Sequence, residues 1–403
     1  MRSPPDLGRP PDIPPKALAM AMALVETGRL HRYSESGGDG GLVAALERDF
    51  ARMMGRRYAV ALNSCGSALF LALKTAGVVP GDKVLLNAFT LGPVPGAVQH
   101  VGARPVLVEI TEDLVIDFDD LRAKARASGA RVLLLSHMRG HLCDLGALAE
   151  LCREEGITLI EDCAHTLGAT WAGWQAGNFG LAGCFSFQSG KHVNTGEGGI
   201  LITDDDDVAA QAILHAGSYR LYRQNGTCPP EQVMVDWFDR CGNYSLRMSA
   251  LVAALALPQL PLLPKRVADW NASHDRIAQR LQAATGFVLP HRPQAEAYAQ
   301  SSLQFRLPAR DKTAMASFID AARARGVWVK WFGSASPEGY SSNPGQWPGA
   351  QATEVPRACA IQTTLCDIRL PLELSAQDCE LIADALIQAA EATDDEKVRC
   401  AKA

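Results

Sequence analysis

Two patterns of apolar and polar residues follow one another along residues 58–161. Helically spaced segments such as Ala68 to Ala76 and Leu145 to Glu155 lie between short apolar runs rich in β-branched residues. The alternation predicts an α/β fold with a mostly parallel sheet covered on both faces. The runs expected as strands are Tyr58 to Leu62, Lys83 to Leu86, Arg104 to Glu109, Arg131 to Ser136 and Thr158 to Glu161.

The flanking segments define the rest of a large domain over residues 16–265. Residues 1–15 carry six prolines and are expected to form an arm rather than a regular helix. Helical spacing follows over residues 16–54, interrupted by a Gly/Ser turn cluster at Ser34 to Gly41. Gly199 to Thr203 is expected as a strand, and Met248 to Leu263 as an apolar helix that ends among prolines.

The pattern loosens toward the C-terminus, where we expect a smaller α+β domain over residues 266–390 and a tail over residues 391–403. Its expected elements are helices at Asn271 to Thr285, Lys312 to Arg325 and Ala376 to Ala390, strands at Ser302 to Leu307 and Val327 to Trp331, and a loop from Gly333 to Gly349.

Composition and charge indicate which partners, cellular location and cysteine chemistry to expect. The net charge is −5 and no long basic run is present, so nucleic acid is not an expected partner. No apolar stretch comes close to the ~20 residues of a membrane span, so we expect a cytoplasmic protein. The 11 cysteines are scattered without a CxxC pair, which favours reduced thiols over disulfides or a metal site.

Chemically reactive residues follow three of the apolar runs. Asn63-Ser64-Cys65-Gly66-Ser67 opens a helix, where small residues allow backbone N–H groups to approach an anion. Asp162 and His165 follow the run that ends at Glu161, and Lys191 follows Phe185-Ser186-Phe187. Each has an ordinary explanation, since Ser and Gly are common in turns, Asp162 fits a helix cap and a single loop lysine is usually solvated.

Taken together, these residues indicate a particular chemistry. A pyridoxal phosphate (PLP) enzyme needs a nucleophilic lysine, a carboxylate at the pyridine nitrogen and an anion site for the phosphate. In an open parallel sheet, residues that follow the strands meet at one edge. Lys191, Asp162 and the turn at Gly66 satisfy these three needs in one α/β unit.

Several motifs together resemble the DegT/DnrJ/StrS family of PLP-dependent aminotransferases, whose fold is type I of the aspartate aminotransferase superfamily. The resemblance spans roughly residues 17–390. It rests on the run Ile160 to Ala169, Phe185-Ser186-Phe187, Lys191, Gly196-Glu197-Gly198-Gly199, Pro80-Gly81-Asp82, Gly102 to Val106, His137 with Gly140, and Leu370-Pro371-Leu372.

The resemblance implies roles for particular residues. Lys191 would carry PLP as a Schiff base and later move a proton, Asp162 would pair with the pyridinium nitrogen, and His165 would hydrogen-bond the ring oxygen. Ser186 falls on the family's phosphate-binding serine. A lysine at 191 also argues against the family's dehydratases, which have histidine there.

Departures from the family pattern leave some roles open. In the phosphate turn the family's threonine is missing, and Ser67 beside Gly66 is the expected substitute. Leu91 stands where an aromatic residue usually stacks on the cofactor ring, with Phe89 as the alternative.

Two more departures concern the partner chain and the substrate. The family asparagine that reaches the partner subunit's phosphate aligns with Ser245, which leaves Asn243 and Arg247 as candidates for that contact and for substrate. The family's late histidine is absent from Trp331 to Tyr340, which argues against a nucleotide-sugar substrate.

The expected function is amino transfer from glutamate or glutamine to a ketone or aldehyde in secondary-metabolite or sugar/cyclitol biosynthesis, by a homodimer with shared active sites. Two alternatives stay open. One is a PLP enzyme of the same fold with another outcome, such as dehydration or oxidation of an amino-acid-like substrate. The other is a non-catalytic PLP-binding partner protein.

Overall fold

The computed structural model describes residues 3–34, 38, 40–336, 343–350 and 354–400, with the backbone alone for 394–400. Its largest sheet has the strand order β1-β9-β8-β5-β4-β2-β3, and β9 is antiparallel to both of its neighbours. The other adjacent pairs are parallel, so the expected fold class is confirmed. The strands are β1 (Tyr58–Leu62), β2 (Lys83–Asn87), β3 (Arg104–Val108), β4 (Val132–Ser136), β5 (Thr158–Asp162), β8 (Ala182–Ser186) and β9 (Gly199–Thr203).

Both faces of this sheet are buried because side chains alternate between them along each strand. In β4, Val132 and Leu134 join one core and Leu133 and Leu135 join another. Burial on two sides explains why these strands read as continuous apolar runs. The covering helices are α2 (Gly41–Met54), α3 (Cys65–Thr75), α4 (Pro93–His100), α5 (Phe118–Ser128), α6 (Leu145–Glu155), α7 (Asp206–Ala216) and α9 (Ala250–Ala256).

Polar residues fix where several helices begin. The side chains of Ser64, Asp117, Asp144 and Asp205 accept a hydrogen bond from a backbone N–H in the first turn of the helix that follows. Each cap lies between the sheet and a covering helix. The caps therefore fix the direction in which each helix leaves the sheet edge.

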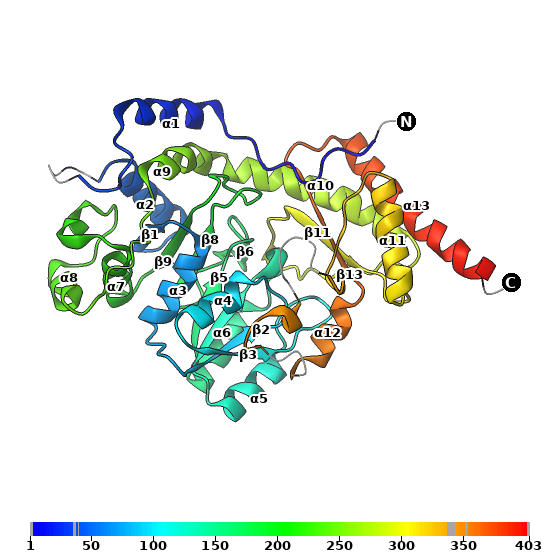
Figure 1. Cartoon of the computed structure of the whole chain (residues 1–403), viewed down its shortest axis with the longest axis horizontal. Helices are drawn as coiled ribbons and strands as arrows, with labels where there is room; N and C mark the ends of the chain where they lie inside the picture. Colours follow the sequence, from blue (N-terminus) through cyan, green and yellow to red (C-terminus); the bar gives the residue numbers. More distant parts are fainter. Residues whose placement is uncertain (1–2, 35–37, 39, 337–342, 351–353, 401–403) are drawn as a thin grey trace.

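A second core lies in the C-terminal part of the chain, where α10 (Leu263–Ala283), α11 (Lys312–Ala324) and α13 (Ala376–Cys400) pack on a smaller sheet. Figure 1 shows α10 running from the region of the large sheet to this C-terminal unit. The sheet has the order β11-β13-β12, all antiparallel, from β11 (Ser302–Arg306), β13 (Leu365–Arg369) and β12 (Lys330–Trp331).

The remaining elements are short or peripheral. Helix α1 (Pro15–Thr27) packs along α9 at the edge of the molecule (Figure 1). The others are α8 (Glu231–Phe238), α12 (Pro356–Gln362), the strands β6 (Thr170–Trp171), β7 (Trp174–Gln175) and β10 (Glu296–Ala297), and the 3-10 helices η1 (Met138–Gly140), η2 (Tyr219–Gln224), η3 (Leu257–Leu262) and η4 (Pro344–Gln346).

The observed elements differ from the sequence expectations in several places. Strand β8 was not expected, because Gly183 and Cys184 weaken its β pattern. Helix α10 begins at Leu263, so the break expected before Asn271 is wrong and the boundary at 265/266 falls inside a helix. Pro264 is compatible with that helix because it sits in the first turn, where its missing N–H is not needed.

Helix α13 continues to Cys400, so most of the expected tail is helical. Parts of the loops expected at Ser34 to Gly41 and Gly333 to Gly349 lie outside the described residues.

Among the described residues, one helical stretch, Ala250–Ala283, is long and apolar enough to cross a membrane by length and composition. It comprises α9, η3 and α10. The sequence reading missed it because Pro258, Pro261 and Pro264 interrupt the run. In the fold 44% of its most apolar window is buried, and core helices of soluble proteins meet the same criterion.

Candidate active site

A cavity of about 320 Å³ lies where the carboxyl ends of β1, β2, β4, β5 and β8 meet. This is the edge of an open α/β sheet at which ligands usually bind, and the volume is at the lower end of small-molecule sites. Six of the expected site residues line it, namely Gly66, Leu91, Asp162, His165, Ser186 and Lys191.

Lys191 lies buried in the loop after β8 and contacts His165. Its Nζ atom is 2.8 Å from His165 Nε2. Burial, together with the nearby charges of Arg139 and Arg369, lowers the pKa of Lys191 to about 7, although Asp162 opposes the shift. Burial and then the charge of Lys191 lower the pKa of His165 well below its usual range. The site therefore holds a neutral imidazole beside an amine that is largely unprotonated above neutral pH.

Asp162 ends β5 with its carboxylate held from two sides. Oδ2 accepts a 2.7 Å hydrogen bond from Ser136 Oγ, at the end of the neighbouring strand β4. Oδ1 accepts a 3.1 Å bond from the backbone N–H of Ala164, and Cys65 Sγ lies 3.9 Å away. Asp162 caps no long helix here, because β6 follows after a short loop. The orientation of the Asp162 carboxylate therefore results from its contacts within the site and not from capping a helix.

The N-terminus of α3 forms another part of the cavity wall. Ser64, Cys65 and Gly66 line the cavity at this end, where the helix dipole favours an anion. Thr90, in the loop after β2, has its Oγ1 atom fully buried and without a hydrogen-bond partner among the described residues. A buried hydroxyl without a partner is uncommon in proteins, and Thr90 is one of the residues that line the cavity. The residues present fit a phosphorylated, ring-shaped ligand with a basic nitrogen near Asp162.

Glu161, directly before Asp162 in β5, is a buried acidic residue next to the site. Its carboxylate accepts hydrogen bonds from the backbone N–H groups of Gly177, Phe179 and Gly180 and contacts His137 Nε2 at 3.0 Å. Burial opposes ionisation, but the bond to His137 and the backbone donors lower the pKa of Glu161. Among the described residues Glu161, His137 and Cys163 form a cluster of metal-ligand type. These hydrogen bonds give both oxygens of the Glu161 carboxylate partners within the described protein.

Four candidate residues do not line this cavity. The Ser67 hydroxyl donates to Asn63 Oδ1 at 2.6 Å, within the turn itself. Phe89 is completely buried against Phe332, which places its ring in the core. The other two candidates are Asn243, which accepts from the backbone N–H of Ser245, and Arg247, which donates to His31.

Sequence reasoning missed several lining residues, among them Ser136, Thr90, Gln188, Glu197 and Arg369. Ser136 could have been found, because it follows an apolar run just as Asp162 does. Arg369 had a weaker signal as a charge within the strand Leu365 to Arg369, which comes from the C-terminal unit. Its approach to Lys191 depends on how the two units pack.

The family model for the DegT/DnrJ/EryC1/StrS aminotransferase family matches residues 29–386. The chain belongs to this family. The match covers the whole large sheet and reaches into α13. The resemblance inferred from the motifs is confirmed.

Curated relatives of this DegT/DnrJ/EryC1/StrS family member include sugar-processing proteins. The chain is 34% identical over 60% of its length to the spore coat polysaccharide biosynthesis protein SpsC of Bacillus subtilis, and 33% identical over 59% to the GDP-perosamine synthase of Caulobacter vibrioides. The matched parts cover 61% and 60% of those relatives.

Among solved structures, the chain resembles 3-amino-5-hydroxybenzoic acid synthase with a TM-score of 0.81. The likeness covers 97% of this chain and 100% of the other at 23% sequence identity. At this identity the comparison establishes a shared fold. It agrees with a type I fold that includes the C-terminal unit.

Proposed function

We propose that the chain is a PLP-dependent aminotransferase that moves an amino group from an amino acid to a ketone or aldehyde. One observation carries the proposal: a buried lysine with its pKa lowered to about 7 shares a cavity with a buried, hydrogen-bonded aspartate. Perturbed lysines paired with such a carboxylate concentrate at sites of covalent catalysis.

PLP would be held by groups already described. The first turn of α3, with Gly66, and the Ser186 hydroxyl would bind the phosphate. Asp162 would contact the ring nitrogen, and Leu91 would cover a ring face. Bound there, the cofactor supplies an electron-withdrawing ring that stabilises negative charge at the substrate carbon.

The chain's own residues then divide the work. Lys191 holds or releases a proton at Nζ near neutral pH, as proton transfer at the substrate carbon requires. The neutral imidazole of His165, with Nε2 2.8 Å from Nζ, orients the amine by this hydrogen bond. Ser136 and Ala164 donate hydrogen bonds to the two oxygens of Asp162, which would keep the carboxylate directed at the ring nitrogen.

The names of matched relatives suggest the class of substrate that we propose. Matched proteins include GDP-perosamine synthase and 3-amino-5-hydroxybenzoate synthase of Amycolatopsis mediterranei. We propose glutamate or glutamine as donor and a carbonyl acceptor in a secondary-metabolite or sugar/cyclitol pathway.

A donor screen tests this function. The cofactor-loaded chain is mixed with single amino acids, and the loss of visible cofactor absorbance is followed together with mass analysis of the keto product. We expect glutamate or glutamine to bleach the absorbance and to give a stoichiometric oxo acid. Bleaching without an oxo acid would favour a different reaction outcome, and no change with any donor would favour a non-catalytic protein.

We further propose a homodimer with shared sites, located in the cytoplasm. No disulfide joins the ten cysteines whose side chains the structure describes, which suits a reducing compartment. Asn63 N donates to Leu246 O, so the segment with Asn243 and Arg247 lies beside the carboxyl end of β1. Asn243 is exposed there and could serve a partner chain.

Subunit mixing tests the shared site. If Lys191→Ala and Arg247→Ala chains are each inactive and exchange at random, about a quarter of the sites should be intact, since half the dimers are mixed and each has one complete site. Proven exchange without recovered activity would contradict a contribution of Arg247 across the interface.

A further inference from the structure

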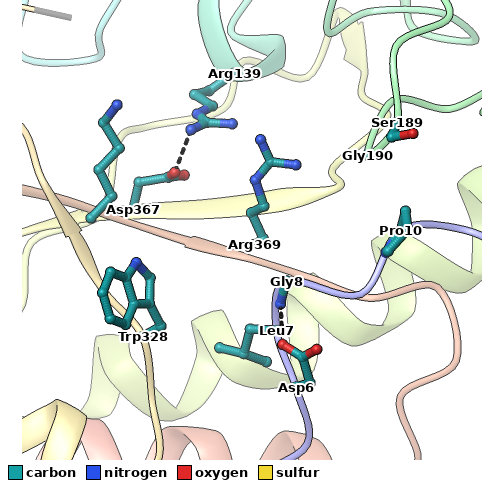
Figure 2. A pocket seen from close by; sticks show the side chains of 11 residues that line it. Asp6, Leu7, Gly8, Pro10, Arg139, Ser189, Gly190, Trp328, Asp367 and Arg369 are labelled. Carbon is teal, nitrogen blue, oxygen red and sulfur yellow. Dashed lines mark hydrogen bonds and ion pairs between the residues drawn. The ribbon is translucent and has the colours of Figure 1, made fainter. Parts of the chain in front are cut away.

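The N-terminal arm, residues 3–14, forms one wall of a second cavity beside the Lys191 site. This cavity has a volume of about 580 Å³, and Arg369 lines both cavities. Figure 2 shows the arm at this cavity together with Ser189 and Gly190, which belong to the lysine loop, residues 187–198 between β8 and β9. The arm residues that line the cavity are Asp6, Leu7, Gly8 and Pro10. The arm and the lysine loop therefore border the same space.

The arm precedes the residues that match the family model, yet it is held at defined contacts. Leu7 is 5% exposed and packs in the core of the C-terminal unit. The main-chain carbonyl of Pro11 accepts a 2.8 Å hydrogen bond from Asn194 Nδ2 in the lysine loop. The carbonyl of Asp12 accepts a 3.1 Å bond from Arg266 Nη2. The arm is thus fixed to the C-terminal core, to the lysine loop and to α10.

Arg266, on α10, is 5% exposed and links the arm to the lysine loop. Besides the bond to Asp12, its Nη1 atom donates to the His192 carbonyl at 3.1 Å and to Gln259 Oε1 at 2.8 Å. These acceptors are main-chain and amide oxygens rather than carboxylates. Burying a charged group is costly unless its donors are matched, so the guanidinium needs all of these segments in place.

Gln259, on η3, holds the lysine loop through its backbone. The residue is completely buried. Its Nε2 atom donates to the Asn194 carbonyl at 2.7 Å, and its Oε1 atom accepts from the Asn194 N–H at 3.1 Å. Asn194 Oδ1 in turn accepts a 3.0 Å bond from Ser189 Oγ, which closes the loop on itself. The main chain on the C-terminal side of Lys191 is therefore tied to α10 and η3.

The position of the Lys191 amine depends on this attachment. Nζ lies 2.8 Å from His165 Nε2, and the peptide group that follows Lys191 carries the carbonyl next to the one that Arg266 holds. A shift of about 1 Å in the loop would lengthen the contact beyond a normal hydrogen bond. Misplacement of a reacting group by about 1 Å can slow a reaction by about 100-fold.

We propose that Arg266 is a positioning residue, which holds the lysine loop and the N-terminal arm on α10 and thereby fixes both the Lys191 amine and the arm wall of the larger cavity. Arg266 itself lines neither cavity. The inference rests on the proposed aminotransferase function and deepens it by naming a residue that acts on Lys191 from outside the site.

The test compares Arg266→Met, which keeps a long side chain without its donors, with Lys265→Met. Lys265 is the preceding residue of α10, with a side chain that is 79% exposed and pairs with Asp269. Stopped-flow absorbance measures how fast each cofactor-free chain captures PLP. Calorimetry measures the affinity for pyridoxine 5′-phosphate, which has the ring and the phosphate but no aldehyde. Amide hydrogen exchange reports on residues 3–14 and 187–198.

We expect Arg266→Met to slow PLP capture by about 10- to 100-fold, because the amine is no longer held in place. The affinity for pyridoxine 5′-phosphate should stay close to that of the parent, since the groups assigned to the phosphate and the ring lie on other elements. Amide exchange should become faster in the arm and in the lysine loop. Arg266→Lys keeps the charge and some of the donors and should recover part of the capture rate, and Lys265→Met should match the parent.

PLP capture by Arg266→Met at the parent rate would overturn the proposal, whatever the exchange shows. An equal loss of capture rate and of pyridoxine 5′-phosphate affinity would also overturn it, because it would indicate general damage to the site. If Arg266→Met does not fold, Arg266→Lys decides by the same two measurements. If the parent captures PLP but forms no oxo acid from any donor, the proposed function fails, while the capture rates still decide the role of Arg266.

Discussion

Ser136 Oγ donates a 2.7 Å hydrogen bond to Asp162 Oδ2, joining the carboxyl ends of the adjacent strands β4 and β5. Both residues are buried. The bond holds the carboxylate toward the cavity that Lys191 shares. Two strands thus cooperate to orient the group assigned to the cofactor's ring nitrogen.

Asp162→Asn should preserve the fold and lower turnover by orders of magnitude, because the ring nitrogen loses its charge partner. Steady-state kinetics and circular dichroism measure the two effects. Ser136→Ala is the matched comparison and should cost about 10- to 100-fold, the worth of one hydrogen bond to a charged group. Activity of Asp162→Asn within a few-fold of the parent would leave Asp162 without the assigned role.

Thr90→Val should weaken cofactor binding by about 5- to 10-fold, as expected for one lost hydrogen bond. The cofactor-free protein should not lose stability, since Thr90 Oγ1 has no partner among the described residues. Equilibrium dialysis and thermal unfolding separate these effects. Thr166→Val, at a buried position outside the cavity lining, serves as control, and equal cofactor affinity in both variants would refute the ligand contact.

Capture of PLP by the cofactor-free chain should become faster with rising pH and level off near pH 7. Burial first, and then Arg139, lower the pKa of Lys191 to about 7, so the nucleophilic neutral amine already predominates just above that pH. An ordinary lysine would level off only near pH 10.4. Stopped-flow absorbance measures the rate, and a rise that continues to pH 10 would contradict a lowered pKa.

Glu161→Gln should lower the free energy of unfolding by about 1–3 kcal/mol at neutral pH, because a buried charged acceptor of several hydrogen bonds is lost. The folded pKa of Glu161 lies below its unfolded value of about 4.3, so its contribution is present above that pH and disappears as the pH falls through the folded pKa. Denaturant unfolding should show the difference shrinking below about pH 4.

Glu150→Gln on the surface of α6 is the control for Glu161 and should leave the free energy of unfolding close to that of the parent, because exposed ion pairs contribute little. Equal effects of the two substitutions would remove the supporting role assigned to Glu161.

Most of the large sheet and several residues of the candidate site could be predicted from the sequence for one physical reason. Lys191, Asp162 and His165 each follow an apolar run, and parallel strands bring such residues to one edge. Ser67 and Phe89 were expected at the cavity from their residue types, which do not reveal local partners. In the structure the Ser67 hydroxyl donates a hydrogen bond to Asn63, and the Phe89 ring packs in the core.

Arg369 shows what sequence patterns could not reveal. It comes from β13, in a separate core, and meets Lys191 only through the packing of the C-terminal unit against the large sheet. Neither its spacing nor its neighbours in the chain indicate that approach.

Hydride reduction of the PLP-loaded chain, followed by peptide mass mapping, tests the central assignment most directly. The account predicts one pyridoxyl label on the peptide that contains Lys191, and none after Lys191→Ala, with Lys330→Ala labelled as in the parent. A label on another lysine in the parent chain, or an unchanged label in Lys191→Ala, would contradict it.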